Sequence, residues 1–393
     1  MKGTLFALLV LVALLQMARA AVSSAQNTAS QTPANTAAAT KKAVPKKATT
    51  AKRSAAKKPA ARKRAYKPAP PVDPTLGDNV DGDDLTVRRA AVAALGTMNG
   101  AVVAVDPTSG RVLSIVNQKL ALKSGFVPCS TIKLVTALAA LSEGVIERDT
   151  PVRLSRSSSF TLTTAIAHSN NLFFQRLGNQ LGFERVTRYA RMLGLGEKAG
   201  LDITGEEPGE WPEQPPKAGG VGMMTAYGED ILMTPLELAG LLSAIANGGT
   251  LYYLQYPRVP EEAGDIEPKV KRPLELASDG ISDIKAGMRG AVDFGTARRA
   301  GYDPNDPILG KTGTCTDFRD SSHLGWFGSF NEVDHHRLVI VVILLGTKSV
   351  NGPVASGVAG AIYRSLSEQR YFAPDYGREA LLPEILSTTC CSR

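Results

Sequence analysis

Apolar positions along the chain predict a sheet whose strands are separated in sequence by helices. In "AVVAVDPTSGRVLSIVN", residues 101–117, two β-rich runs flank the turn formers Pro107, Ser109 and Gly110, which predicts a hairpin. Strand patterns return near the end as "PILGKTGTCT", "HLGWFGSF" and "RLVIVVILLGT". A helix of small residues at about 356–368 is expected to close the folded part.

Residues 130–250 carry helical patterns interrupted by Gly and Pro. The stretch "TPLELAGLLSAIANGG" shows the usual signals of a helix, with Thr234 before it, Pro235 in its first turn and Gly248 at its end. We therefore expect a folded domain over residues 85–370. Its sheet lobe should comprise 97–120 and 290–370, and its helical lobe 130–250.

The first residues have the features of a secretory signal. Lys2 precedes an apolar run over residues 5–15 and the small-residue triplet 18–20. The apolar run is shorter than the roughly 20 residues of a membrane-spanning helix, so residues 1–20 are expected to be a cleaved signal, with an uncleaved anchor as the alternative. The protein is predicted to be exported, either periplasmic or associated with the cell envelope.

A basic segment follows. Of the 45 lysines and arginines, 14 precede residue 72, whereas none of the 37 acidic residues precedes Asp73, so the net charge of +8 belongs to this segment. Residues 21–84 are expected to form a disordered Ala/Lys/Pro-rich tether, and 371–393 a C-terminal tail. The tether suits an anionic wall or membrane surface better than nucleic acid, and a solvated spacer is the alternative.

Candidate chemistry lies at the start of "VPCSTIKLVTALAALSEG", residues 127–144. No polar face separates Lys133 from Ser142, and a helix that is apolar all round is normally buried. Ser130 and Lys133 share its first turn, where burial lowers the pKa of the lysine and makes it available as a base. Serine is also a common N-cap, and the same spacing occurs at residues 54/57 and 282/285.

Two further motifs separate this pair from the others. Ser169 and Asn171 lie in a polar break, "HSNNLFF", between helical stretches, and "GKTGT" at 310–314 lies on a predicted strand. This order resembles the penicillin-binding transpeptidase and serine β-lactamase superfamily. The similarity extends over "FTLTTAIAHSNNLFFQRLGNQLG", "TPLELAGLLSAIANGG" and "GMRGAVDFGTARRA", and covers most of residues 99–366. It implies an α+β fold, an antiparallel sheet flanked by helices with an all-helical lobe inserted.

The resemblance assigns roles to four catalytic residues. Ser130 would be the acylated nucleophile and Lys133 its general base. Ser169 would relay a proton to the leaving amine, and Lys311 would support that relay and favour the terminal carboxylate of the substrate.

Four more residues would bind the substrate by the same resemblance. Asn171 would hold its amide side, while Thr312, Gly313 and Thr314 would present a strand edge to an extended peptide. The N–H of Thr314 would complete an oxyanion hole with that of Ser130, and its hydroxyl could meet the carboxylate. Neither a metal nor a cofactor is required.

The implied function is that of a D,D-transpeptidase acting on D-Ala-D-Ala stem peptides of peptidoglycan and acylated by β-lactams. The alternatives are a class D-like β-lactamase, a D,D-carboxypeptidase, and a non-catalytic sensor that binds penicillin or peptidoglycan. The short connection 118–129 favours a class D enzyme, whereas Asn171 favours a penicillin-binding protein, because class D enzymes usually have a hydrophobic residue there.

The remaining candidates receive structural interpretations. Of the four cysteines, Cys129 and Cys315 are expected to be buried thiols; an exported protein could form a disulfide, but the sequence does not assign its pairing. His168 and His323 are interpreted as structural or solvent-facing. Trp326 and Phe327 are interpreted as sheet packing.

Overall fold

A computed structural model describes residues 73–123, 125–259, 262, 266–301, 303–333 and 336–374. The predicted signal, most of the predicted tether and most of the C-terminal tail lie outside these residues. Within the described part, no helix combines the length and the apolar character that crossing a membrane would require.

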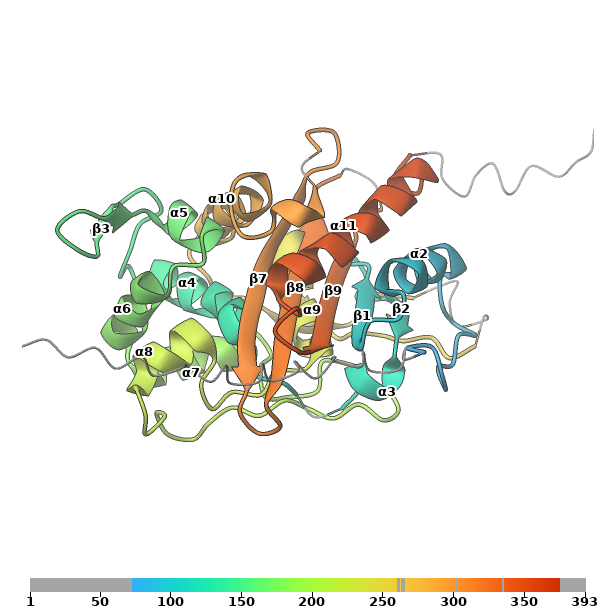
Figure 1. The fold of residues 1–393 in the computed structure, drawn as a ribbon, viewed down its shortest axis with the longest axis horizontal. Coiled ribbons are helices and arrows are strands. Elements are labelled where there is room, and N and C mark those ends of the chain that lie inside the picture. Colours follow the sequence, from blue (N-terminus) through green and yellow to red (C-terminus); the bar gives the residue numbers. More distant parts are fainter. Residues whose placement is uncertain are drawn as a thin grey trace, which may run out of the picture. The chain divides into compact units, whose positions relative to one another are not determined.

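The main sheet has five antiparallel strands in the order β2-β1-β9-β8-β7 (Figure 1). The predicted hairpin and the three later strands are confirmed. Their bounds are β1 Gly100–Val105, β2 Val112–Val116, β7 Ile308–Asp317, β8 Ser322–Asn331 and β9 Val339–Gly346. Since β7 is the last of the described strands in this order, it pairs with a described strand on one side only.

Helices cover both faces of this sheet (Figure 1). All six residues of β1 are buried because successive side chains point to opposite, equally covered faces. Val102 and Ala104 pack with α2 (Leu85–Leu95) and α11 (Gly352–Glu368). Ala101, Val103 and Val105 pack into the other core, which includes α9 (Pro235–Asn247).

The position of α9 differs from our expectation. The sequence pattern predicts residues 235–247 to lie in the helical lobe, but α9 packs against β1, β8 and β9 of the sheet. Every residue from Pro235 to Ala246 is buried. A helix that is buried all round can serve as an inner layer between sheet and lobe, and the sequence pattern does not distinguish that position from the interior of the lobe.

Side-chain caps explain where the helices α9 and α11 begin. Thr234 and Glu237 form the capping box of α9, and Gly248 ends it with a φ of 95°. The helix α11 begins at Gly352, four residues before the predicted start. Asn351 Oδ1 accepts the N–H of Val354 at 3.0 Å, and a proline occupies the first turn.

The inserted lobe is mainly helical. Two short strand pairs, β3 with β4 and β5 with β6, accompany the helices, so the expected all-helical lobe is not purely helical. The remaining elements are α3 Gln118–Ala121, η1 Cys129–Ile132, α4 Lys133–Ser142, β3 Val152–Arg153, β4 Ser159–Phe160, α5 Leu162–Ala167, α6 Asn171–Leu181, α7 Phe183–Met192, α8 Gly220–Tyr227, β5 Thr250–Tyr252, β6 Val270–Pro273, α10 Gly280–Asp293 and η3 Arg298–Ala300.

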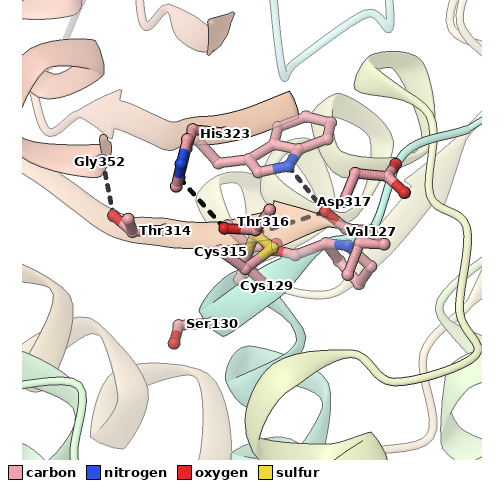
Figure 2. Close-up of a disulfide and its surroundings, with 12 residues drawn as sticks. Val127, Cys129, Ser130, Thr314, Cys315, Thr316, Asp317, His323 and Gly352 are labelled. Carbon is pink, nitrogen blue, oxygen red and sulfur yellow. Dashed lines mark hydrogen bonds between the residues drawn. A yellow bond between two sulfur atoms is a disulfide. The ribbon is translucent and has the colours of Figure 1, made fainter. Parts of the chain in front are cut away.

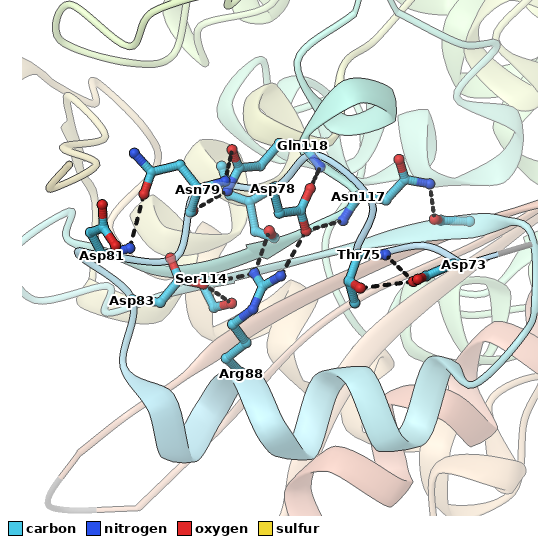
Figure 3. Close-up of polar contacts among 12 residues, drawn as sticks. Asp73, Thr75, Asp78, Asn79, Asp81, Asp83, Arg88, Ser114, Asn117 and Gln118 are labelled. Carbon is cyan, nitrogen blue, oxygen red and sulfur yellow. Dashed lines mark hydrogen bonds and ion pairs between the residues drawn. The ribbon is translucent and has the colours of Figure 1, made fainter.

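Residues 73–84, the end of the predicted tether, belong to the folded part (Figure 3). Arg88 of α2 forms ion pairs with Asp78 and Asp83 at 2.8 and 2.9 Å. Asp78 also accepts the backbone N–H groups of Asn117 and Gln118. These carboxylates are almost fully buried, so their ion pairs with Arg88 attach the segment to the domain. The apolar content of the sequence, from which the tether is predicted, does not reveal such charge pairing.

Candidate active site

Ser130 lies in a short 3₁₀ turn, η1, that leads directly into the buried helix α4. Pro128 occupies the cap position and no side chain caps the turn, so Ser130 is not an N-cap. Its Oγ instead lies 2.9 Å from Lys133 Nζ. The predicted proximity of serine and lysine at the mouth of a buried helix is confirmed.

Lys133 is fully buried and connects Ser130 to the next motif. Its Nζ lies 2.8 Å from Ser169 O, 3.1 Å from Ser169 Oγ and 2.5 Å from Asn171 Oδ1. The ring of Phe174 lies 5.6 Å from the same nitrogen. Within the described residues no carboxylate pairs with Lys133, so the lysine has polar but uncharged acceptors.

The residues between α5 and α6 place the second motif against Lys133. Ser169 adopts a φ of 54°, in the left-handed region, which for a non-glycine residue costs roughly 1–2 kcal/mol. Asn170 Oδ1 caps α6 by accepting the N–H of Phe173 at 3.0 Å. The two adjacent asparagines therefore make different contacts: Asn170 caps α6, whereas Asn171 contacts Lys133.

Lys311 of β7 reaches the same place from the sheet. Its side chain is fully buried, and its Nζ donates to Ser169 Oγ at 2.8 Å and to Thr312 O at 2.9 Å. Burial, followed by the charge of Lys311, lowers the pKa of Lys133 to about 6. Burial lowers the pKa of Lys311 to about 7.

The strand residues 312–314 lie beside the turn that carries Ser130. A Cβ atom at Gly313 would lie only 3.0 Å from Pro128 O and 3.3 Å from Cys129 Cβ, so a glycine permits this approach. Thr312 Oγ1 lies 2.6 Å from Thr296 Oγ1. Thr314 is exposed, and its Oγ1 accepts the N–H of Gly352 at the start of α11.

A disulfide joins Cys129 to Cys315, which corrects our interpretation of both as buried thiols (Figure 2). Their Cα atoms are 5.6 Å apart across a sequence separation of 186 residues. The only signal in the sequence was positional, since one cysteine precedes Ser130 and the other follows Thr314. The absence of metal-ligand spacing does not determine which of the four cysteines pair, and neither does the local sequence pattern.

The sequence also did not predict a second contact to the segment that leads to Ser130. The indole N–H of Trp326 donates to Val127 O at 2.9 Å, so this buried residue anchors the approach to Ser130 as well as packing in the sheet. Phe327 is buried in the core that includes α2 and α11.

The weaker candidates have other surroundings. His168 is exposed and packs its ring against Phe294, and His323 Nδ1 lies 3.1 Å from Thr316 Oγ1. Ser282 donates to Asp279 O, while Lys285 pairs with Glu332. The two residues of this second serine–lysine pair therefore make separate structural contacts.

A cavity of about 600 Å³ adjoins the site beyond Thr314. Its walls come from β7, from the turn after it and from the end of α8. Cys315 and the highly exposed Phe318 line it, together with Tyr227. Among the described residues, no group of three or more His, Cys, Asp or Glu side chains is arranged to hold a metal.

This fold and this arrangement of serines and lysines define a class of protein, and the similarity of the chain to known proteins identifies that class. Residues 100–368 match the family model of the penicillin binding protein transpeptidase domain. The chain belongs to that family.

Curated relatives agree with this assignment. The chain is 29% identical over 300 residues to stage V sporulation protein D of Bacillus subtilis, covering 66% of this chain and 44% of the relative. It is 24% identical over 329 residues to peptidoglycan D,D-transpeptidase FtsI of Escherichia coli K12, covering 72% and 54%. The match thus spans about half, or less, of the length of these relatives.

Solved structures show the same fold. A crystal structure of Pseudomonas aeruginosa PBP2 in complex with WCK 5153 matches with a TM-score of 0.62 at 23% identity, over 75% of this chain and 79% of that one. PBPA from Mycobacterium tuberculosis matches with a TM-score of 0.62 at 21% identity, over 72% and 81%.

Proposed function

We propose that this chain is a serine D,D-transpeptidase that acts on D-Ala-D-Ala stem peptides of peptidoglycan and is acylated by β-lactams. The observation that carries the proposal is the position of Lys133 Nζ, 2.9 Å from Ser130 Oγ and 3.1 Å from Ser169 Oγ. An amine whose pKa is about 6 is largely neutral at pH 7. A neutral amine has one lone pair, which can accept the Ser130 proton.

In the acylation step, Ser130 Oγ attacks the carbonyl carbon between the two terminal D-alanines. The hydroxyl proton moves to Lys133 Nζ, and the carbonyl electron pair moves to the oxygen. The backbone N–H groups of Ser130 and Thr314 are the proposed donors to this oxyanion. Asn171 would hold the amide side of the substrate while its Oδ1 orients Lys133.

Collapse of the tetrahedral intermediate restores the carbonyl and breaks the bond to the leaving nitrogen. The proton passes from Lys133 through Ser169 Oγ to that nitrogen, and D-alanine departs. Lys311, in contact with Ser169 Oγ, favours this transfer when it is charged. Lys311, with the hydroxyl of Thr314, would also bind the substrate's terminal carboxylate.

The fate of the acyl-serine decides between related activities. An amine of a second stem peptide would complete transpeptidation, whereas water would give a carboxypeptidase or a class D-like β-lactamase. Among the described residues, the hydrogen bonds of Ser130, Lys133 and Ser169 involve no carboxylate. This supports slow hydrolysis, and therefore a long-lived penicilloyl ester.

Intact-mass spectrometry after exposure to benzylpenicillin tests the proposal. We expect one persistent adduct on the wild type, none on Ser130→Ala, and full labelling of the matched control Ser282→Ala. A rapid return to the unmodified mass would instead indicate a β-lactamase. An unlabelled wild type, or equal labelling of Ser130→Ala, would favour a non-catalytic binding module.

The exported location and the role of the basic tether are part of the same proposal. Peptidoglycan lies outside the cytoplasm, which fits the signal expected at residues 1–20. We propose that the tether adds salt-sensitive adhesion to an anionic wall or membrane surface. Deleting residues 21–71 should reduce co-sedimentation with envelope fragments at low salt, and unchanged sedimentation would reject the adhesive role.

A further inference from the structure

The disulfide occupies a position that bears on the proposed chemistry. Cys129 immediately precedes Ser130, and Cys315 immediately follows Thr314. The bond therefore joins the direct neighbours of the two residues whose N–H groups are the proposed oxyanion donors. We propose that the Cys129–Cys315 disulfide is a positioning element that fixes the spacing of these donors. This inference rests on the proposed function.

The strand needs such a restraint because β7 lies at the edge of the sheet. On one side it pairs with β8 along its whole length, whereas on the other side no strand among the described residues pairs with it. Its further contacts include the turn η1 and the helices α10 and α11. A disulfide confines its two Cα atoms to about 4.4–6.8 Å. Oxyanion donors must lie about 2.7–3.1 Å from the oxygen that becomes negatively charged, so sliding of β7 away from Ser130 would remove one donor.

The backbone of Cys129 supports a specific role for its side chain. Its φ is 52°, in the region that favours glycine. A cysteine is disfavoured there unless its side chain makes a compensating interaction, and the bond to Cys315 is that interaction. The close packing of Gly313 against Pro128 and Cys129 shows that the strand and the turn are in direct contact at this point.

The two sulfur-bearing residues differ in exposure, which makes the bond accessible to experiment. Cys129 is fully buried, whereas Cys315 is partly exposed and lines the cavity beside Thr314. This cavity is therefore the side from which a small reductant would reach the bond.

The test uses the full chain with Cys390→Ser and Cys391→Ser, so that only one pair can form. In this background, Cys129→Gly with Cys315→Ala removes the disulfide and places a glycine at the left-handed position. We expect the first-order rate of penicillin acylation to fall about tenfold or more, while the dissociation constant of the initial complex changes by less than about twofold. Circular dichroism confirms that the variant is folded.

Reduction of the folded parent protein provides a second, reversible measurement. Tris(2-carboxyethyl)phosphine should lower the acylation rate to that of the double variant, and oxidised glutathione should restore it. A lower melting temperature with an unchanged acylation rate would mean that the bond serves stability only, and would overturn the inference. Free thiols at both positions in fully active protein would also overturn it.

These outcomes separate the inference from the proposed function. A parent protein that penicillin does not acylate at Ser130 would show that the function itself is wrong. A parent that is acylated at the same rate with and without the disulfide would leave the function intact and reject only the positioning role.

Discussion

Lys133 and Lys311 contact the same hydroxyl oxygen, Ser169 Oγ, at 3.1 and 2.8 Å. The two lysines come from a helix and from a strand, and both are fully buried. The positive charge of Lys311 opposes protonation of Lys133, so the site favours states in which at most one lysine is charged. The two lysines, for which different catalytic roles are proposed, can then differ in protonation at the same pH.

The pH profile of acylation should report both lysines. Acylation by benzylpenicillin, followed as the second-order rate constant, should rise with pH through about 6 as Lys133 loses its proton and should fall above about 7 as Lys311 does. Stopped-flow measurement from pH 5 to pH 9 checks this shape.

Replacing Lys311 should move the acidic limb of that profile. The charge of Lys311 contributes to the lowered pKa of Lys133, so in Lys311→Ala the acidic limb should shift to higher pH. The maximal rate should also fall because the relay through Ser169 loses its support. An unshifted limb would show that burial alone sets the pKa of Lys133. Ser282→Ala serves as the control and should retain the wild-type profile.

Burial of the Lys133 amine should make the wild type less stable than a variant with an uncharged side chain at this position. Between the lowered pKa of about 6 and the ordinary value of 10.5, the unfolded state binds this proton more readily than the folded state, so the stability of the wild type rises with pH in that window. Lys133→Met should therefore raise the free energy of unfolding by about 2 kcal/mol at pH 7, and by less at pH 10. Urea denaturation at both pH values measures the difference.

Exposed Lys119 provides the control for that experiment. Lys119→Met should change the free energy of unfolding by less than about 0.5 kcal/mol. A stabilisation of Lys133→Met that is the same at pH 7 and pH 10 would contradict a proton-linked origin.

The adjacent asparagines should separate function from stability. Asn171→Ala removes the contact to Lys133 and should slow acylation about tenfold or more, with little change in stability. Asn170→Ala removes the cap of α6 and should lower the free energy of unfolding by about 1 kcal/mol, with acylation unchanged. Parallel acylation and denaturation measurements compare the two. If both variants lost activity equally, Asn171 would have no distinct role.

Arg88 should be the electrostatic attachment of residues 73–84. Arg88→Ala leaves Asp78 and Asp83 buried without their partner, which should lower the free energy of unfolding by about 3 kcal/mol. The neighbouring Arg89 is exposed, and Arg89→Ala should have little effect. Equal stability of the two variants in urea denaturation would mean that the segment is held by other contacts.

Local sequence patterns determined the elements and the identity of the candidate residues. Alternation and apolar runs predicted the five strands of the sheet, and the signals around Thr234, Pro235 and Gly248 predicted α9. The motifs containing Ser130, Ser169 and Lys311 were selected by their order along the chain. Such features follow from periodicity and from short-range sterics, which neighbouring residues impose on each other.

Only the tertiary structure decided how these residues meet. Ser169 and Lys311 are 142 residues apart in sequence, and Cys129 and Cys315 are 186 apart. Their pairing depends on how the lobe packs on the sheet. The attachment of residues 73–84 through Arg88, and the position of α9 beneath the sheet, likewise depend on distant partners. Burial of the two lysines, and so their chemistry, results from that packing because desolvation depends on everything around a charge.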